Sequence, residues 1–236
     1  MNVDKSDARV KRMFGQIAPR YDRMNHLLSM NVDRYWRWKT VRRVAPQGTA
    51  PILDVCTGTG DLAFAYLRRV QPGTEVVATD FCREMLHQGS LKQQRQRGTG
   101  QVTFLEADTQ QLPFDDDLFQ IVSVAFGLRN VSDTDQGLAE MTRVCKPGGR
   151  VAVLEFSQPA WQPFKALYGC YMKYLLPRVG QLLARNRENA YKYLPESVNE
   201  FPSGAALVER MEKSGLQQVR YHQLSLGIAT LYVGVK

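Results

Sequence analysis

Short apolar runs and amphipathic stretches alternate through the middle of the chain. The apolar runs are four to eight residues long and predict β-strands at 52–55, 75–79, 102–105, 119–126 and 151–156. Between them, apolar positions recur at helical spacing and predict helices at 62–70, 83–95 and 134–144. The Lys-Pro-Gly-Gly stretch at 146–149 predicts a turn. Strands that alternate with helices favour a parallel sheet that is covered on both faces.

The pattern changes after the fifth predicted strand. Residues 158–200 are rich in Tyr, Leu and Pro and predict a helical insertion over the sheet. A helix at 203–214 follows, and two strands at 217–224 and 228–235 are close enough to pair as an antiparallel edge. The chain is therefore predicted to be α/β, with a Rossmann-like, doubly wound sheet of seven strands. Its length of 236 residues suits a single domain over 1–236.

The N-terminal 45 residues mix apolar and basic positions. Pro19 interrupts a helical pattern over 10–30, which predicts a shorter helix followed by a longer one, and residues 31–44 predict a further helix. Residues 1–45 carry eleven Lys or Arg and four Asp, a net charge of +7, whereas the rest of the chain carries +1. We therefore expect a basic helical lid over 1–45 that faces an anionic surface, with a merely solvated helix face as the alternative.

Composition narrows the class of protein. Hydrophobic residues make up 44% of the chain and charged residues 23%, as in ordinary globular domains. No two of the four cysteines form a C-x-x-C pair, so neither a zinc site nor a redox motif is expected. The first twelve residues are too charged for a signal peptide, and charges and prolines interrupt the most apolar stretch, 164–184. We expect a cytoplasmic protein with no metal centre.

One glycine turn joins the first predicted strand to the first helix of the alternating region. The stretch 53–61 reads Leu-Asp-Val-Cys-Thr-Gly-Thr-Gly-Asp, and Gly58 and Gly60 allow backbone angles that a side chain would disfavour. Asp61 falls at the helix start, where a carboxylate suits the helix dipole and can cap backbone N–H groups. Asp80 follows Gly60 by twenty residues, the spacing of a ribose-binding acid. The turn fits a dinucleotide site and an S-adenosylmethionine (SAM) site equally well.

Acidic residues end three successive predicted strands. Because ligands of such sheets bind outside the carboxyl ends of the strands, these residues should meet at one site. Asp54 is placed to face the ammonium of the methionine moiety, Asp80 to accept the ribose hydroxyls, and Asp108 to reach the adenine amino group. The terminal strand pair and the lack of a Tyr-x-x-x-Lys pair in the insertion favour SAM over a dinucleotide.

Two motifs of nucleic-acid methyltransferases are absent from the sequence, and their absence narrows the choice of methyl acceptor. Adenine methylation calls for an Asp/Asn-Pro-Pro-aromatic turn after the fourth strand, where this chain has Ala-Phe-Gly-Leu-Arg-Asn at 125–130. Cytosine methylation calls for a Pro-Cys nucleophile, which does not occur. We therefore expect no nucleic-acid partner and favour a phospholipid surface for the basic segment. An RNA methyltransferase and a non-catalytic SAM-binding protein remain the alternatives from other classes.

Four motifs resemble the quinone-biosynthesis C-methyltransferases, the family of demethylmenaquinone methyltransferase and its ubiquinone-pathway relatives. They lie at 21–36, beginning Tyr-Asp-x-Met-Asn, at 126–131, at 143–157 and at 191–197. The resemblance covers the chain from about residue 9 to its end. It implies SAM contacts at Thr59, Asp80 and the Asp108-Thr109 pair. Two positions depart from the family pattern, since Asp33 replaces a usual His and Ala125 a frequent Ser that contacts SAM.

The resemblance implies methyl transfer from SAM to a ring carbon of a reduced, prenylated quinone. The expected reaction converts demethylmenaquinol to menaquinol, and C-methylation of 2-methoxy-6-polyprenyl-benzoquinol, or of both acceptors, is the alternative. A phenol has a pKa of about 10, so a base or a cationic stabiliser is needed near neutral pH. The candidate stabilisers after the fourth strand are Arg129 and Asn130. The N-terminal segment adds His26, Tyr21 and Asp22.

The prenyl tail requires an apolar slot that opens toward a bilayer. The insertion offers apolar residues for its lining, facing the N-terminal helices: Trp161, Phe164, Leu167, Tyr168, Tyr171, Leu175 and Leu176. We expect peripheral contact with an anionic membrane, on the inner face of the cell membrane. The oligomeric state cannot be read from the sequence.

Overall fold

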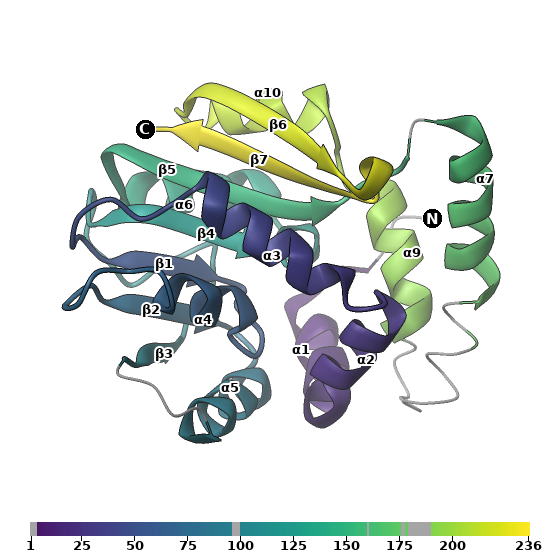
Figure 1. The fold of residues 1–236 in the computed structure, drawn as a ribbon, viewed down its shortest axis with the longest axis horizontal. Helices are drawn as coiled ribbons and strands as arrows, with labels where there is room; N and C mark the ends of the chain where they lie inside the picture. Colours follow the sequence, from purple (N-terminus) through teal and green to yellow (C-terminus); the bar gives the residue numbers. More distant parts are fainter. Residues whose placement is uncertain (1–3, 96–99, 160, 176–177, 179–189) are drawn as a thin grey trace.

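A single seven-stranded sheet forms the centre of the molecule (Figure 1). The structure is a computed structural model that describes residues 4–95, 100–159, 161–175, 178 and 190–236. The strands, in chain order, are β1 (Ile52–Val55), β2 (Val76–Asp80), β3 (Val102–Glu106), β4 (Phe119–Ala125), β5 (Cys145–Phe156), β6 (Gln217–Leu224) and β7 (Ala229–Val235). Their order across the sheet is β3-β2-β1-β4-β5-β7-β6.

The sheet confirms the predicted topology. Strands β1 to β5 pair in parallel, and β7 pairs antiparallel with both β5 and β6. The strand order reverses between β1 and β4, which is the switch point at which open α/β sheets bind their ligands. The α/β class with seven strands and an antiparallel end is therefore as expected.

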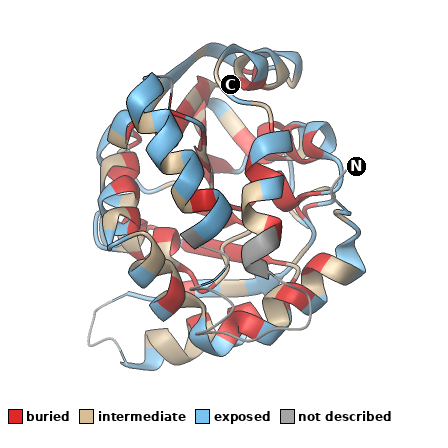
Figure 2. Cartoon of the chain, turned by 90° about the vertical axis from the view of Figure 1, so that its right-hand side faces the viewer, coloured by how far each residue is buried: buried red, intermediate tan, exposed pale blue. Residues whose placement is uncertain are grey.

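Alternating residues of the central strands enter two separate cores. Leu53 and Val122 face a core completed by α6 (Thr134–Val144) and α10 (Ala205–Lys213). Their neighbours Ile52 and Ile121 face a core completed by α3 (Val32–Arg43) and α4 (Asp61–Leu67). Side chains of a strand alternate between the two faces of a sheet, so continuous apolar runs are required when both faces are covered. Figure 2 shows buried residues gathered on the strands and the inner helix faces.

The N-terminal helices lie at the carboxyl ends of the parallel strands (Figure 1). Helix α1 (Asp7–Ile17) is followed by a short turn of 3₁₀ helix (Ala18–Arg20) and by α2 (Tyr21–Leu28). Pro19 does break the helical pattern, but the predicted order of lengths was wrong, because the first helix has 11 residues and the second has 8. Helix α2 ends early because Met30 and Asn31 adopt left-handed backbone angles, with φ of +50° and +61°.

The predicted turn at 146–149 is part of strand β5 and not a separate turn. Its backbone pairs with the end of the chain, since Gly148 N donates to Lys236 O at 2.8 Å and Lys236 N donates to Gly149 O at 3.1 Å. Gly148 keeps a left-handed angle, with φ of +71°, and the pairing of β4 with β5 is irregular at this point. The predicted strand therefore starts six residues earlier, at Cys145.

The described part of the predicted insertion is helical. It contains α7 (Gln162–Cys170), one π-helical turn (Tyr171–Leu175) and α9 (Ala190–Glu200). Helix α9 lies beside the N-terminal helices, with α7 farther out (Figure 1). The remaining helix, α5 (Arg83–Arg95), contacts β2, β3 and α1. Among the described residues, no helix combines the length and the apolar character needed to cross a bilayer.

Candidate active site

The glycine turn after β1 has the backbone form that the sequence predicts. Gly58 and Gly60 both have left-handed angles, with φ of +58° and +83°. A Cβ on Gly60 would lie 2.9 Å from the ring of Phe104, so this position has no room for a side chain. The turn therefore brings bare backbone to the switch point between β1 and β4.

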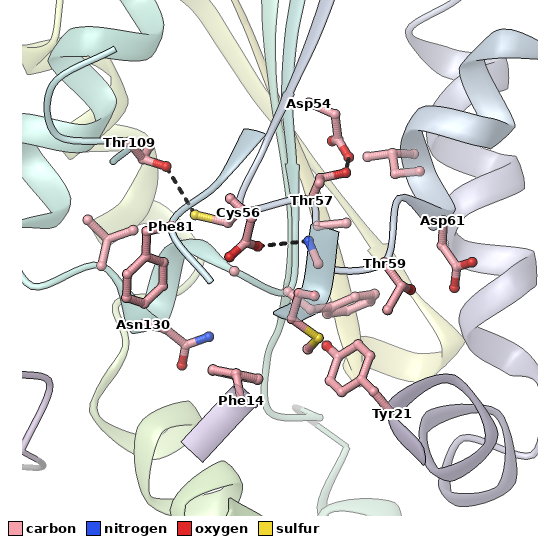
Figure 3. Close-up of a pocket in the computed structure, with 18 of the residues that line it drawn as sticks. Phe14, Tyr21, Asp54, Cys56, Thr57, Thr59, Asp61, Phe81, Thr109 and Asn130 are labelled. Carbon is pink, nitrogen blue, oxygen red and sulfur yellow. Dashed lines mark hydrogen bonds between the residues drawn. The ribbon is translucent and has the colours of Figure 1, made fainter. Parts of the chain in front are cut away.

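A cavity opens at this point, which we name the strand-end cavity (Figure 3). It encloses about 810 Å³ of empty space, including the part open to solvent. Nine of the twelve predicted site residues line it or are part of its turn: Tyr21, Asp54, Gly58, Thr59, Gly60, Asp80, Asp108, Thr109 and Asn130. Ala125 also lines it, and its methyl group offers no hydrogen bond where many relatives of the resembled family carry Ser.

Asp54 is held rigidly at the end of β1. Its carboxylate accepts hydrogen bonds from Thr57 Oγ1 at 2.6 Å and from Ser123 Oγ at 2.8 Å (Figure 3 draws the first). Burial raises the pKa of Asp54 to about 6, although both hydroxyl groups lower it. The two oxygens have further lone pairs, so the group can still attract a cation in the cavity.

Asp80 is held in the same way by backbone groups. It accepts hydrogen bonds from Gly58 N at 2.8 Å and from Cys82 N at 2.9 Å. Burial raises its pKa to about 6, against the lowering effect of these bonds. Asp108, at the next strand end, is exposed and accepts from Gln110 N at 2.9 Å, and Thr109 contacts the sulfur of Cys56 at 3.1 Å.

Thr59 ties the glycine turn to the N-terminal helices. Its hydroxyl donates to Asp22 Oδ1 on α2 at 2.5 Å, and Lys92 Nζ on α5 donates to Thr59 Oγ1 at 3.0 Å. Lys92 also pairs with Asp22 and with Asp61, at 2.7 Å in each case. We expected Asp61 to cap the start of α4, but it makes no capping hydrogen bond there. Its side chain instead lies toward the cations Lys92 and Arg37.

A second cavity, which we name the helical cavity, lies between the N-terminal helices and the described part of the insertion. It encloses about 2130 Å³, again including open space, and its wall is mainly apolar. Of the predicted tail-binding residues, Phe164, Leu167, Tyr168 and Tyr171 line it. Trp161 does not and is 63% exposed. The side chain of Leu175 and the whole of Leu176 lie outside the described residues.

The two cavities meet. Four residues line both of them: Phe14 and Tyr21 from the N-terminal helices, Arg37 from α3, and Phe126 after β4. Tyr21 is thus at the junction, as a catalytic candidate should be. Burial raises its pKa above the usual value, so its hydroxyl stays protonated near neutral pH.

The neighbouring residues Arg129 and Asn130 line different cavities. Arg129 lines the helical cavity and Asn130 the strand-end cavity. Arg129 is buried, with Nη1 donating to Glu155 Oε1 at 2.8 Å and to the carbonyl of Phe126. Its Nε and the Asn130 Oδ1 are buried without a hydrogen-bond partner among the described residues. Buried polar atoms without a partner are uncommon in native proteins, so these two atoms need an explanation.

Asp22 and His26 line neither cavity. Asp22 is engaged by Thr59 and Lys92, and His26 Nδ1 lies 2.8 Å from Asp33 Oδ2. The structure therefore places both beside the site and not in contact with either space. Their assignment as catalytic residues stays a prediction from the sequence.

Asp33, where the resembled family usually carries His, is the centre of a buried polar network. Besides His26, it accepts from Ser29 Oγ at 2.7 Å and from Arg37 Nη1 at 2.5 Å. His26, Asp33 and Asp61 offer ligand atoms within 4.8 Å of one another, as a metal site would. The guanidinium of Arg37 already pairs with Asp33 and lies near Asp61, so the group is an ion-pair network.

Among the residues of the cavity walls that sequence reasoning missed, two carry polar groups of particular interest, Arg37 and Tyr193. Arg37 lines both cavities, but its sequence neighbourhood of aromatic and basic residues pointed to a lipid surface. Tyr193 on α9 lines the helical cavity, and its buried hydroxyl has no partner among the described residues. Tyr193 lies in one of the motifs that carry the resemblance, which was the available signal.

Comparison with known proteins agrees with this geometry. The profile described as the ubiE/COQ5 methyltransferase family matches residues 2–236. A ubiquinone/menaquinone biosynthesis C-methyltransferase of Geobacter sp. (strain M21) is 43% identical, with 99% of each chain covered. A demethylmenaquinone methyltransferase of Bacteroides fragilis (strain ATCC 25285) is 37% identical, over 100% of this chain and 95% of that one.

Solved structures resemble the chain in fold. A SAM-dependent methyltransferase of Thermotoga maritima superimposes with a TM-score of 0.67 at 17% identity, over 94% of this chain and 98% of that one. A phosphoethanolamine N-methyltransferase of Haemonchus contortus in complex with SAM gives a TM-score of 0.62 at 14% identity, over 86% and 52%. The fold, the site geometry and the full-length match lead to one assignment: this chain belongs to the ubiE/COQ5 methyltransferase family.

Proposed function

We propose that the chain transfers a methyl group from SAM in the strand-end cavity to a ring carbon of a reduced, prenylated quinone in the helical cavity. The observation that carries this proposal is the shared wall of the two cavities at Phe14, Tyr21, Arg37 and Phe126. A donor site and an acceptor site must meet for a direct transfer, and holding the reacting atoms in line is worth about 7–11 kcal/mol.

The charge of the strand-end cavity suits SAM. SAM supplies an activated methyl group on a cationic sulfonium. Five aspartates line the cavity, at positions 7, 54, 61, 80 and 108, and give it a negative potential that suits this cation. We assign the ribose to Asp80, the adenine to Asp108 and Thr109, and the ammonium of the methionine end to the neighbourhood of Asp54.

The helical cavity supplies hydrogen-bond donors for the acceptor oxygen. A ring carbon becomes nucleophilic as the adjacent hydroxyl group loses its proton, so a developing phenolate has to be stabilised. Arg129, Tyr21 and Tyr193 all line this cavity. The hydroxyl of Tyr21 is protonated, and the Arg129 Nε and the Tyr193 hydroxyl are buried without a partner among the described residues. We propose that these groups bind and orient the quinol oxygens, with Arg129 as the cationic stabiliser.

The names of the relatives support a quinol as the methyl acceptor. They are compatible with two ring systems, a naphthoquinol and a benzoquinol. We propose demethylmenaquinol as the acceptor, and a prenylated benzoquinol is the second candidate because the Geobacter relative is named for both pathways. The ratio of kcat/KM for the two reduced quinones, measured with the same prenyl length, decides between them. A ratio above one for the naphthoquinol supports the proposal, and a preference for the benzoquinol reverses the assignment.

We further propose that the helical cavity opens toward an anionic bilayer, as a prenyl tail requires. Three residues that line the cavity are also exposed, namely Met30 at 79%, Leu167 at 67% and Tyr174 at 48%. They mark the mouth of the cavity, and Arg178 beside them is a further exposed residue of its lining. Apolar side chains next to basic ones suit an interface with anionic lipid, so we propose a cytoplasmic protein that is peripheral to the membrane.

A further inference from the structure

Basic residues are scarce in the described wall of the strand-end cavity, since Lys92 pairs with Asp61 but does not itself line the cavity. Of the described residues that line this cavity, Arg37 is the one Lys or Arg, whereas five are aspartates. The only anionic group of SAM is the α-carboxylate of its methionine end. The aspartates repel this carboxylate, whereas the Arg37 guanidinium attracts it, although Arg37 also lies close to Asp33 and Asp61.

The order of the strands gives the ligand a direction. Asp108 follows β3 and Asp80 ends β2, so the adenine and ribose lie toward that edge of the sheet. The strand order continues through β1 to β4, where the methionine end should lie. Arg37 is found on this side, because its Cζ is 5.7 Å from the ring centroid of Phe126, directly after β4.

One nitrogen of the Arg37 guanidinium is hydrogen-bonded to Asp33, whereas the other makes a longer ion pair with Asp61 that leaves its N–H groups without a hydrogen bond among the described residues. Nη1 donates to Asp33 Oδ2 at 2.5 Å, and this is the only hydrogen bond of the guanidinium among the described residues. Nη2 is 3.6 Å from Asp61 Oδ2, which is beyond hydrogen-bond distance. Asp61 itself is already paired with Lys92 at 2.7 Å. The side chain is 11% exposed, so a carboxylate bound there is largely shielded from solvent.

We infer that Arg37 binds the α-carboxylate of SAM through Nη2, with Asp33 as the positioning residue that holds Nη1. A guanidinium fork matches a carboxylate in geometry, and the bond is charge-assisted. Because Arg37 also lines the helical cavity, the same side chain separates the methionine end from the acceptor. The inference rests on SAM occupying the strand-end cavity.

A pair of ligands tests this assignment directly. Binding of SAM and of decarboxylated SAM, in which a hydrogen replaces the carboxylate, is measured by calorimetry on the full chain. We expect the wild type to prefer SAM by about 10- to 100-fold, the range for a hydrogen bond to a charged group. Arg37→Met should abolish the preference by weakening SAM alone, and Arg37→Lys should keep part of it. Arg34→Met, an exposed position on the same helix, is the matched control and should behave as wild type.

Three results would overturn the assignment. Equal binding of the two ligands to the wild type would do so without any variant, which keeps the test valid even if Arg37→Met does not fold. Equal weakening of both ligands in Arg37→Met and in Arg37→Lys would show that Arg37 is structural. A raised KM for the quinol with unchanged SAM affinity would assign Arg37 to the acceptor. If Asp80→Asn leaves both ligands unaffected, the placement of SAM itself is wrong.

Discussion

Asp54 and Asp80 make ligand binding in the strand-end cavity dependent on pH. Burial raises the pKa of each carboxyl to about 6, so each is protonated in the free protein at lower pH. The folded-state pKa lies above the unfolded value of 3.8, so the folded protein binds protons more tightly. Their contribution to the free energy of unfolding therefore decreases as pH rises from about 4 to about 6, and it is constant above that range.

SAM affinity should follow the ionised forms of these two residues. We expect the dissociation constant to increase below about pH 6, by up to about tenfold per pH unit for each group. Calorimetry between about pH 5 and 7 checks this, since an α-amino group with a pKa of about 8 stays protonated in that range. The Asp80→Asn variant should bind weakly and show a shallower dependence. A flat affinity profile for the wild type would contradict the assigned roles.

Arg129 should contribute to turnover more than to SAM binding. Replacing it with Lys keeps a positive charge beside Glu155 but loses the Nε donor, which has no partner among the described residues. We expect kcat to fall by about 10²-fold, as for the loss of one donor to a developing oxyanion, with SAM affinity unchanged. Single-turnover kinetics with a reduced quinone measure this. Arg150→Lys, on β5 away from both cavities, is the control, and full activity of the Arg129 variant would exclude the role.

The strand-end cavity was predicted best at the carboxyl ends of the strands and at the glycine turn. Asp54 lies near the end of the first predicted strand, Asp80 and Asp108 come after the next two, and the topology of a parallel sheet brings such positions together. Arg37 could not be found in this way, because which side of α3 faces the cavities depends on packing against α4 and β5. Asp22 and His26 lie in the segment that contributes to the site, but the sequence does not show whether their side chains reach a cavity.

At the scale of the elements, a hydrogen bond and an ion pair of Asp22 link helix α2 to the glycine turn and to α5. Asp22 on α2 contacts Thr59 of the turn and Lys92 of α5, and these contacts hold α2 beside the glycine turn. We propose that the segment over 1–45 acts as a lid whose closed form these contacts stabilise. The ion pair is about a quarter exposed on each side, so its contribution should be modest.

Asp22→Asn should loosen this lid. We expect the KM for SAM to increase about two- to fivefold, because loss of a partly exposed charge pair costs up to about 1 kcal/mol. Hydrogen exchange of residues 7–28 should become faster in the same variant. Asp116→Asn removes an exposed pair with Arg143 elsewhere and should change neither quantity. An unchanged KM together with unchanged exchange would show that these contacts of Asp22 have no role.

Elements with strong periodicity were predicted well. The helix at 83–95, the helix at 134–144 and the strand at 217–224 have the predicted bounds, and buried residues account for the pattern of the two helices. The segment at 146–149 was mistaken for a turn, because its pairing with Lys236 joins residues far apart in sequence. The helix lengths around Pro19 were reversed because left-handed residues at 30–31 end α2 early.

At the scale of the whole molecule, the mouth of the helical cavity should bind membranes. Met30 is 79% exposed, and its insertion into a bilayer would bury an apolar side chain worth about 1.5–3 kcal/mol. Met30→Asp should therefore weaken binding to vesicles of anionic phospholipid about tenfold or more. Vesicle flotation measures this at low and high salt. Leu118→Asp, at the amino end of β4, is the matched control.

The outcome for these variants separates a membrane surface from a solvated helix face. Binding that is equal for the wild type and Met30→Asp would place the contact elsewhere. Wild-type protein that fails to bind anionic vesicles in the presence of a prenylated quinol would contradict the proposed membrane contact.

The central claim is that a methyl group passes from the strand-end cavity to a ring carbon in the helical cavity. A single turnover with SAM labelled with ¹³C in its methyl group, and with reduced demethylmenaquinone as the acceptor, tests it most directly. We predict that nuclear magnetic resonance of the extracted product finds the label on the ring carbon as a C-methyl group. Label on a quinol oxygen, or SAM bound with no transfer to the quinol, would contradict the account.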